Sequence, residues 1–227
     1  MKPRVLITAE GTYPFLGGGV STWCHELTHQ IPEIDFKIFS IVANPYIEQQ
    51  YQLATNVNQL LKVPLWGMED PIEYGWRFPF SRALKSKIAT TGTIISQLFI
   101  PIFEKLLTGI LLPDLMDIET LGHTVVVIHE YFLRYDYHKT MTSIEVWKCF
   151  QQIAATAWQS QIKPDRVTLG EIAEALKLFY RLLIPLHVPI PPTDLIHSSS
   201  ASYCGLPGVV GKIKHGLPYL LTEHGIN

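Results

Sequence analysis

The fold is decided by the stretch Glu10-Gly-Thr-Tyr-Pro-Phe-Leu-Gly17-Gly18-Gly19-Val-Ser-Thr-Trp23. It follows the apolar run Val5–Ala9 and leads into residues 20–31, where apolar side chains recur at helical spacing. Strand, glycine turn and helix in this order form the opening unit of a nucleotide-handling α/β domain. The glycines let the backbone take positive φ and let a ligand approach closely. The free N–H groups at the start of the helix then form an anion site.

Further apolar runs predict the other strands of the same domain. They cover residues 36–42, 59–65, 194–198 and 219–222. The segment 200–215 predicts a helix, because it ends in basic residues followed by Gly216, a typical αL cap. We therefore expect an α/β fold with a Rossmann-like parallel sheet.

A helical insertion is expected over residues 81–185, inside this α/β frame. Two segments fit the capping box, with Thr142 before Glu145 and Thr168 before Glu171. An apolar stripe runs along 94–112 and is interrupted by Pro101. Because this stripe carries Glu104, Lys105 and a proline, we expect a buried or surface-docking helix and no transmembrane segment.

Composition excludes several classes of protein. The chain has 227 residues, 47% hydrophobic content and a net charge of −2, which describe a globular protein with no electrostatic attraction to nucleic acid. Cys24, Cys149 and Cys204 are widely spaced and odd in number, so we expect no disulfide framework and no zinc site. With no credible signal peptide, the expected location is the cytoplasm; a peripheral position at the inner face of the membrane stays open.

Few motifs carry specific chemistry. The glycine loop matches neither GxGxxG nor the P-loop, His129-Glu130 lacks the second histidine of HExxH, and Ser198 lacks a GxSxG context. Glu223 and His224 follow the last strand at its carboxyl end, where ligands of open α/β sheets bind. Both are therefore candidates for binding a ligand. Glu223 could act as an acid or base, but the sequence shows no partner carboxylate for it. No metal is expected.

Three segments together resemble a known family: residues 10–23, residues 194–211 and the closing Tyr219-Leu-Leu-Thr-Glu-His-Gly-Ile226. They are similar to the N-terminal domain of retaining glycosyltransferases of family four, in the subgroup typified by the Pel exopolysaccharide glycosyltransferase. The segment Ser143-Ile-Glu-Val-Trp147 also resembles that subgroup, so the resemblance covers essentially the whole chain.

The resemblance implies a GT-B architecture, in which two Rossmann-like domains face each other across a cleft. Residues 1–227 correspond to the first, acceptor-side domain, and the second domain holds the nucleotide sugar. The co-substrate in this subgroup is a uridine diphosphate sugar, with no other cofactor and no metal. By residue, the resemblance assigns His224 to the donor sugar as the catalytic group and Glu10, Gly17, Gly18 and Gly19 to the donor cleft.

The sequence stops at Asn227, where the family pattern continues into the donor-binding domain. We therefore expect that hexose transfer to a polysaccharide or other glycan needs this missing half. This half would lie further along the same protein or in a separate C-terminal glycosyltransferase chain, and a membrane synthase complex is the other candidate partner. The alternative is a non-catalytic carbohydrate- or partner-binding module, or a truncated relic. A nicotinamide-binding domain is disfavoured, because the dinucleotide fingerprint is missing.

Overall fold

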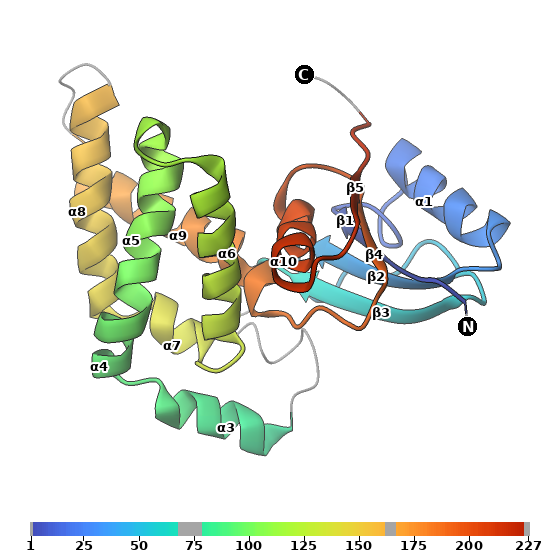
Figure 1. The fold of residues 1–227 in the computed structure, drawn as a ribbon, viewed down its shortest axis with the longest axis horizontal. Helices are drawn as coiled ribbons and strands as arrows, with labels where there is room; N and C mark the ends of the chain where they lie inside the picture. Colours follow the sequence, from blue (N-terminus) through green and yellow to red (C-terminus); the bar gives the residue numbers. More distant parts are fainter. Residues whose placement is uncertain (1, 68–78, 162–166, 225–227) are drawn as a thin grey trace. The chain divides into compact units, whose positions relative to one another are not determined.

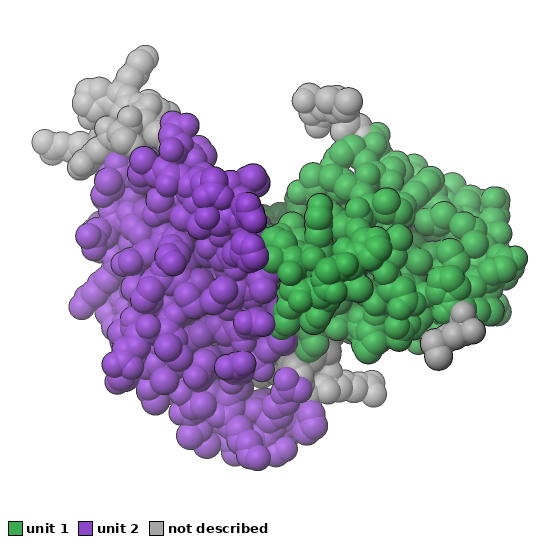
Figure 2. All heavy atoms as spheres, viewed as in Figure 1, with its two compact units in different colours: residues 1–77, 188–227 green, residues 78–187 purple. Residues whose placement is uncertain are grey.

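The chain divides into two compact units in a computed structural model that describes residues 2–67, 79–161 and 167–224. Residues 1–77 and 188–227 form the first unit, coloured green in Figure 2, and residues 78–187 form the second, coloured purple. The helical insertion expected over 81–185 falls within the second unit. The Trp66–Pro71 loop that follows the third strand lies partly outside the described residues.

The first unit is built on a five-stranded parallel sheet with strand order β3-β2-β1-β4-β5 (Figure 1). The strands are β1 Arg4–Glu10, β2 Asp35–Val42, β3 Val57–Pro64, β4 Leu195–Ser198 and β5 Tyr219–Leu221. This confirms the expected α/β fold class with a Rossmann-like parallel sheet. Only β3 departs clearly from the expected range, since it begins two residues before residue 59.

Two helices cover opposite faces of this sheet (Figure 1). On one face, Ile7 and Ile38 are paired neighbours and pack in one core with Cys24 of α1 (Gly19–Gln30). The side chains that alternate with Ile7 and Ile38 along the strands point to the opposite face, away from α1. On that face, Ile196 of β4 packs against α10 (Leu206–His215). A Cβ at Gly211 would come within 2.2 Å of the Ile196 Cδ1 atom, so α10 packs directly on β4. The alternation of side chains along each strand thus supplies both interfaces.

The end of α10 follows the sequence pattern. Gly216 has φ 65° in the left-handed region, and its N–H donates to the carbonyl oxygens of Gly211 and Lys212. Lys212, Lys214 and His215 occupy the last turn, where positive charge favours the helix dipole. The predicted αL cap is confirmed, and it turns the chain directly into β5.

The second unit is helical over its described residues. Its helices are α3 Phe80–Ala89, α4 Gly92–Ile94, α5 Ile100–Leu111, α6 Ile118–Phe132, α7 Tyr137–Met141, α8 Ile144–Gln161 and α9 Leu169–Leu183. Short helical turns follow α5 (Pro113–Leu115) and α9 (Ile184–His187). Phe99 and Phe103 stack at 5.3 Å between ring centroids, and both are fully buried. Aromatic and aliphatic burial of this kind stabilises the bundle.

Pro101 does not break the apolar helix, contrary to the interruption expected from the sequence. A π-helical segment, Ile95–Phe99, joins α4 to α5, and Pro101 stands in the first turn of α5. Proline lacks an N–H and clashes with the carbonyl four residues earlier; the wider π-turn before it accommodates both effects. The continuous run Gly92–Leu111 is long and apolar enough to cross a membrane by length and composition alone, and one third of its best window is buried.

The two expected capping boxes had different outcomes. Thr168 caps α9, accepting from the Glu171 N–H while the Glu171 carboxylate accepts from the Thr168 N–H, so this box is confirmed. The box at Thr142 is wrong by one residue, because α8 begins at Ile144. Ser143 is the capping residue there, and its hydroxyl accepts from the Val146 N–H at 3.3 Å.

Candidate functional site

The candidate site lies at the carboxyl ends of the strands, where the strand order reverses. From β1 the chain passes through α1 to β2 on one side, whereas β4 pairs with β1 on the other side and leads through α10 to β5. The loops that follow β1, β4 and β5 are residues 11–18, 199–202 and 222–224. Ligands of open α/β sheets bind at such a switch point.

A buried anchor fixes the loop that follows β1. Tyr13 and Phe15 are buried, and Ser40 of β2 donates a hydrogen bond to the Tyr13 carbonyl oxygen at 2.9 Å. The N–H groups of Gln50 and Tyr51 both donate to the Pro14 carbonyl oxygen. The exposed glycines at positions 17–19 therefore extend from a rigid base.

The three glycines are not equivalent. Gly18 has φ 149° and ψ 171°, a conformation that only glycine adopts readily, whereas Gly17 and Gly19 do not have positive φ. A Cβ added at Gly19 would meet nothing within 4 Å. The backbone thus requires glycine at position 18 alone, and the space in front of Gly19 is open to a ligand.

The N-terminus of α1 is left without a side-chain cap. Gly18 is the capping residue, no acidic residue stands in the first turn, and the first helical bond runs from the Thr22 N–H to the Gly18 carbonyl oxygen. The N–H groups that precede Thr22 have no carbonyl within the helix to bind. The Ser21 side chain is fully buried, and its hydroxyl has no hydrogen-bond partner within the described residues. Donors without acceptors at a helix N-terminus form a ready anion site.

Glu10, at the end of β1, contacts the segment that follows β4. Burial raises the pKa of its carboxyl, against the lowering effect of the Ser202 hydroxyl and the N–H groups of Cys204 and Tyr203. Its second oxygen, Oε2, is buried and finds no partner in the described parts of the chain, as does the Thr12 hydroxyl. A buried carboxylate oxygen without a donor is costly and calls for an explanation, such as a ligand donor that binds there.

His224 lies beside α1. Its ring packs edge-on against Trp23 at 4.9 Å between centroids, and Trp23, one helical turn beyond Gly19, also meets His197 of β4 at 5.2 Å. The His197 Nε2 atom is 2.7 Å from the Thr222 hydroxyl, and burial followed by the neighbouring His224 lowers the pKa of His197. The exposed imidazole of His224 is therefore held at the same end of α1 as the glycines.

Glu223 is exposed. Burial raises the pKa of the Tyr219 hydroxyl, and the Glu223 carboxylate adds a smaller effect in the same direction. The structure thus joins His224 to α1 through Trp23, and it places Glu223 next to His224 in the loop that follows β5.

Other reactive residue types have structural roles. The cysteines are free and buried, and burial raises the pKa of Cys24 and of Cys149 to about 12, which makes both poor nucleophiles. His129 is buried, with Nδ1 2.7 Å from the Leu186 carbonyl oxygen. In the described residues, no group of three or more His, Cys, Asp or Glu side chains could hold a metal ion.

Sequence reasoning did not identify Trp23, His197 and Ser202 as members of this site. Trp23 stands in the opening stretch, but its partners lie more than 170 residues away in the chain, so only the strand pairing reveals them.

The family described as Domain of unknown function (DUF3492) matches residues 3–227. No curated protein and no solved structure matches the chain.

Proposed function

Because the chain belongs to the family described as Domain of unknown function (DUF3492), whose description assigns no reaction, we propose a function from its site. The chain is the acceptor-side domain of a glycosyltransferase, which transfers a hexose from a nucleotide sugar to a polysaccharide or other glycan. A uridine diphosphate sugar is the proposed donor. A second domain or chain completes the active site. The resemblance of the opening and closing motifs to retaining glycosyltransferases supports the same proposal.

One observation carries the proposal: the uncapped N-terminus of α1, with open space before Gly19. The donor diphosphate would accept hydrogen bonds from the first amides of α1, and the positive end of the helix dipole would stabilise its charge. That charge grows on the departing diphosphate during transfer, so donors fixed in advance favour the transition state.

The neighbouring side chains have roles that fit a sugar. The exposed His224 imidazole, supported by the Trp23 ring, would hydrogen-bond a hydroxyl of the donor sugar. The Glu10 carboxylate, at the end of β1, would accept a hydrogen bond from a ligand hydroxyl at the mouth of the loop. The cationic side chains that neutralise the remaining negative charge of the diphosphate would come from the second domain.

Binding of uridine diphosphate glucose, measured by calorimetry on the parent and on two valine variants, tests the proposal. In Gly19→Val the new side chain enters the open space before the amides, so affinity should fall at least tenfold. The control is Gly170→Val, a first-turn glycine of α9 whose Cβ would meet only the Thr168 hydroxyl at 3.8 Å. If both variants fold and bind uridine diphosphate glucose with equal affinity, the start of α1 is not the anion site.

A second candidate function rests on the Trp23–His224 pair. An aromatic ring beside an exposed imidazole suits saccharide binding without transfer. This module would bind oligosaccharides with an affinity that uridine diphosphate leaves unchanged. Competition by uridine diphosphate would favour the transferase, and saccharide binding that is insensitive to it would favour the module.

A further inference from the structure

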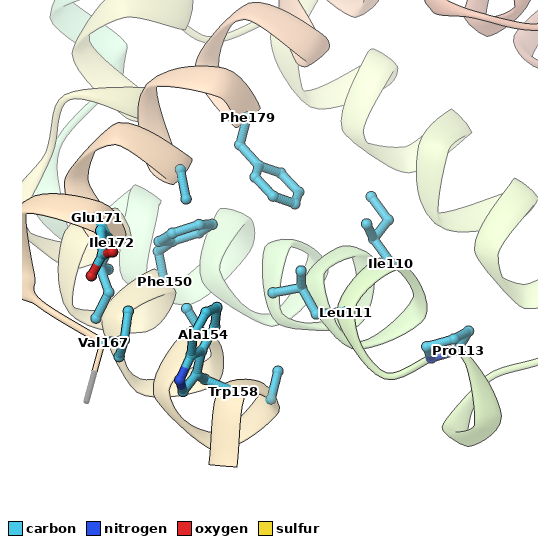
Figure 3. A pocket seen from close by; sticks show the side chains of 12 residues that line it. Ile110, Leu111, Pro113, Phe150, Ala154, Trp158, Val167, Glu171, Ile172 and Phe179 are labelled. Atoms are coloured by element: carbon cyan, nitrogen blue, oxygen red, sulfur yellow. The ribbon is translucent and has the colours of Figure 1, made fainter. Parts of the chain in front are cut away.

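The helical unit contains a cavity that the proposed transferase site does not use. It has a volume of about 530 Å³ and lies between α5, α8 and α9 (Figure 3). Its walls include Ile110, Phe150, Ala154, Trp158 and Phe179. Small-molecule sites have volumes of about 300–1,000 Å³ and often lie between the helices of bundles. The cavity is therefore large enough for a ligand.

The lining offers almost nothing to a polar ligand. The Glu171 carboxylate and the Trp158 indole N–H are the only polar side-chain groups among the described lining residues. The carboxylate already accepts from the Thr168 N–H at 2.8 Å and from the Thr168 hydroxyl at 2.9 Å. Those bonds lower the pKa of Glu171 and keep it in the cap of α9. Sugars, nucleotides and peptides would leave their polar groups unpaired against such walls.

The size selects among apolar occupants. A benzene-sized apolar cavity is roughly 150 Å³, so this one is too large for a single small ring. A three-turn helix about 10 Å wide occupies roughly 1,300 Å³, so a partner helix could insert side chains but could not enter whole. A linear hydrocarbon chain combines a suitable volume with purely apolar contacts. At the rim, Ile110 and Trp158 are 39% and 42% exposed, which marks where such a chain would enter.

We propose that this cavity binds the hydrocarbon chain of a single-chain lipid, with the lipid's head group outside. The chain would lie among α5, α8 and α9 and fill space that water would occupy poorly, because an apolar cavity offers it too few hydrogen-bond partners. The inference is independent of the transferase proposal, since the described lining residues all belong to the helical unit.

Calorimetric titration of the chain with dodecanol and decanol provides the test. The parent should bind one dodecanol, and shortening the chain should weaken binding by about fourfold per methylene. Ala154→Leu places extra atoms in the cavity and should weaken dodecanol binding at least tenfold. Ala155→Leu is the matched control, because it lies next on α8 with similar exposure and outside the lining.

Three results would overturn the proposal: no dodecanol binding by the parent, equal binding by both leucine variants, or several weak sites with no dependence on chain length. If Ala154→Leu does not fold, Ala175→Leu fills the same cavity from α9 and serves in its place. Circular dichroism confirms the fold of each variant before titration.

Discussion

At the residue scale, adjacent glycines are kept for different reasons. Gly18 has a backbone conformation that disfavours every side chain, whereas Gly19 has ordinary φ and open space around its Cβ position. Gly18→Ala should therefore destabilise the protein by about 1–3 kcal/mol. Gly19→Ala should change the free energy of unfolding by less than about 0.5 kcal/mol. Urea unfolding of both variants measures the difference, and equal losses would contradict the assigned backbone roles.

Glu10 is a second residue whose local structure points to function, because its partly buried, charged carboxylate lowers the stability of the folded protein at neutral pH. Its carboxyl pKa is raised by burial above the unfolded value, so the folded state holds the proton more tightly. Glu10 therefore favours the folded state most below its unfolded pKa of 4.5, and this contribution is lost as pH rises through the folded pKa.

Glu10→Gln removes this titration, since glutamine stays neutral and its carbonyl oxygen can still accept from Ser202. The variant should be as stable as the parent at acid pH and more stable at neutral pH, while it loses any contact that needs the carboxylate. Chemical denaturation at several pH values is the measurement. A variant less stable than the parent at neutral pH would show that Glu10 supports the fold instead.

At the element scale, the start of α8 distinguishes two capping residues one position apart. Ser143 accepts from the Val146 N–H, so Ser143→Ala should destabilise the chain by about 1 kcal/mol. Glu145→Ala should have a smaller effect, because Glu145 belongs to the box that the structure does not form. Thermal unfolding of the two variants decides between the caps, and a larger loss from Glu145→Ala than from Ser143→Ala would restore the box at Thr142.

Local patterns predicted most elements of the sheet and missed features that depend on a neighbour. The end of α10 at Gly216 and the start of α9 at Thr168 follow from a few adjacent residues, and both were predicted. The effect of Pro101 was not, because sequence spacing gave no sign of the π-turn that accommodates it. Thr142 and Ser143 both suit a cap, and the sequence pattern does not say which one is used.

At the scale of the whole molecule, the site depends on contacts between distant parts of the chain. The sequence placed the glycine loop and His224 at carboxyl ends of strands, which parallel pairing brings to one edge of the sheet. It did not indicate that Trp23 of α1 packs against His224, or that Glu10 forms a hydrogen bond with Ser202. These pairings follow from strand order, which no local pattern specifies.

The central claim is that the amides at the start of α1 bind the diphosphate of a nucleotide sugar. Its most direct test is amide nitrogen–proton NMR of the isotope-labelled protein during titration with uridine diphosphate glucose. The amide signals of Gly19, Val20 and Ser21 should shift most and saturate together, while those at the start of α9, from Leu169 to Glu171, stay in place. Saturable binding that leaves the signals of residues 19–21 unchanged would contradict the claim.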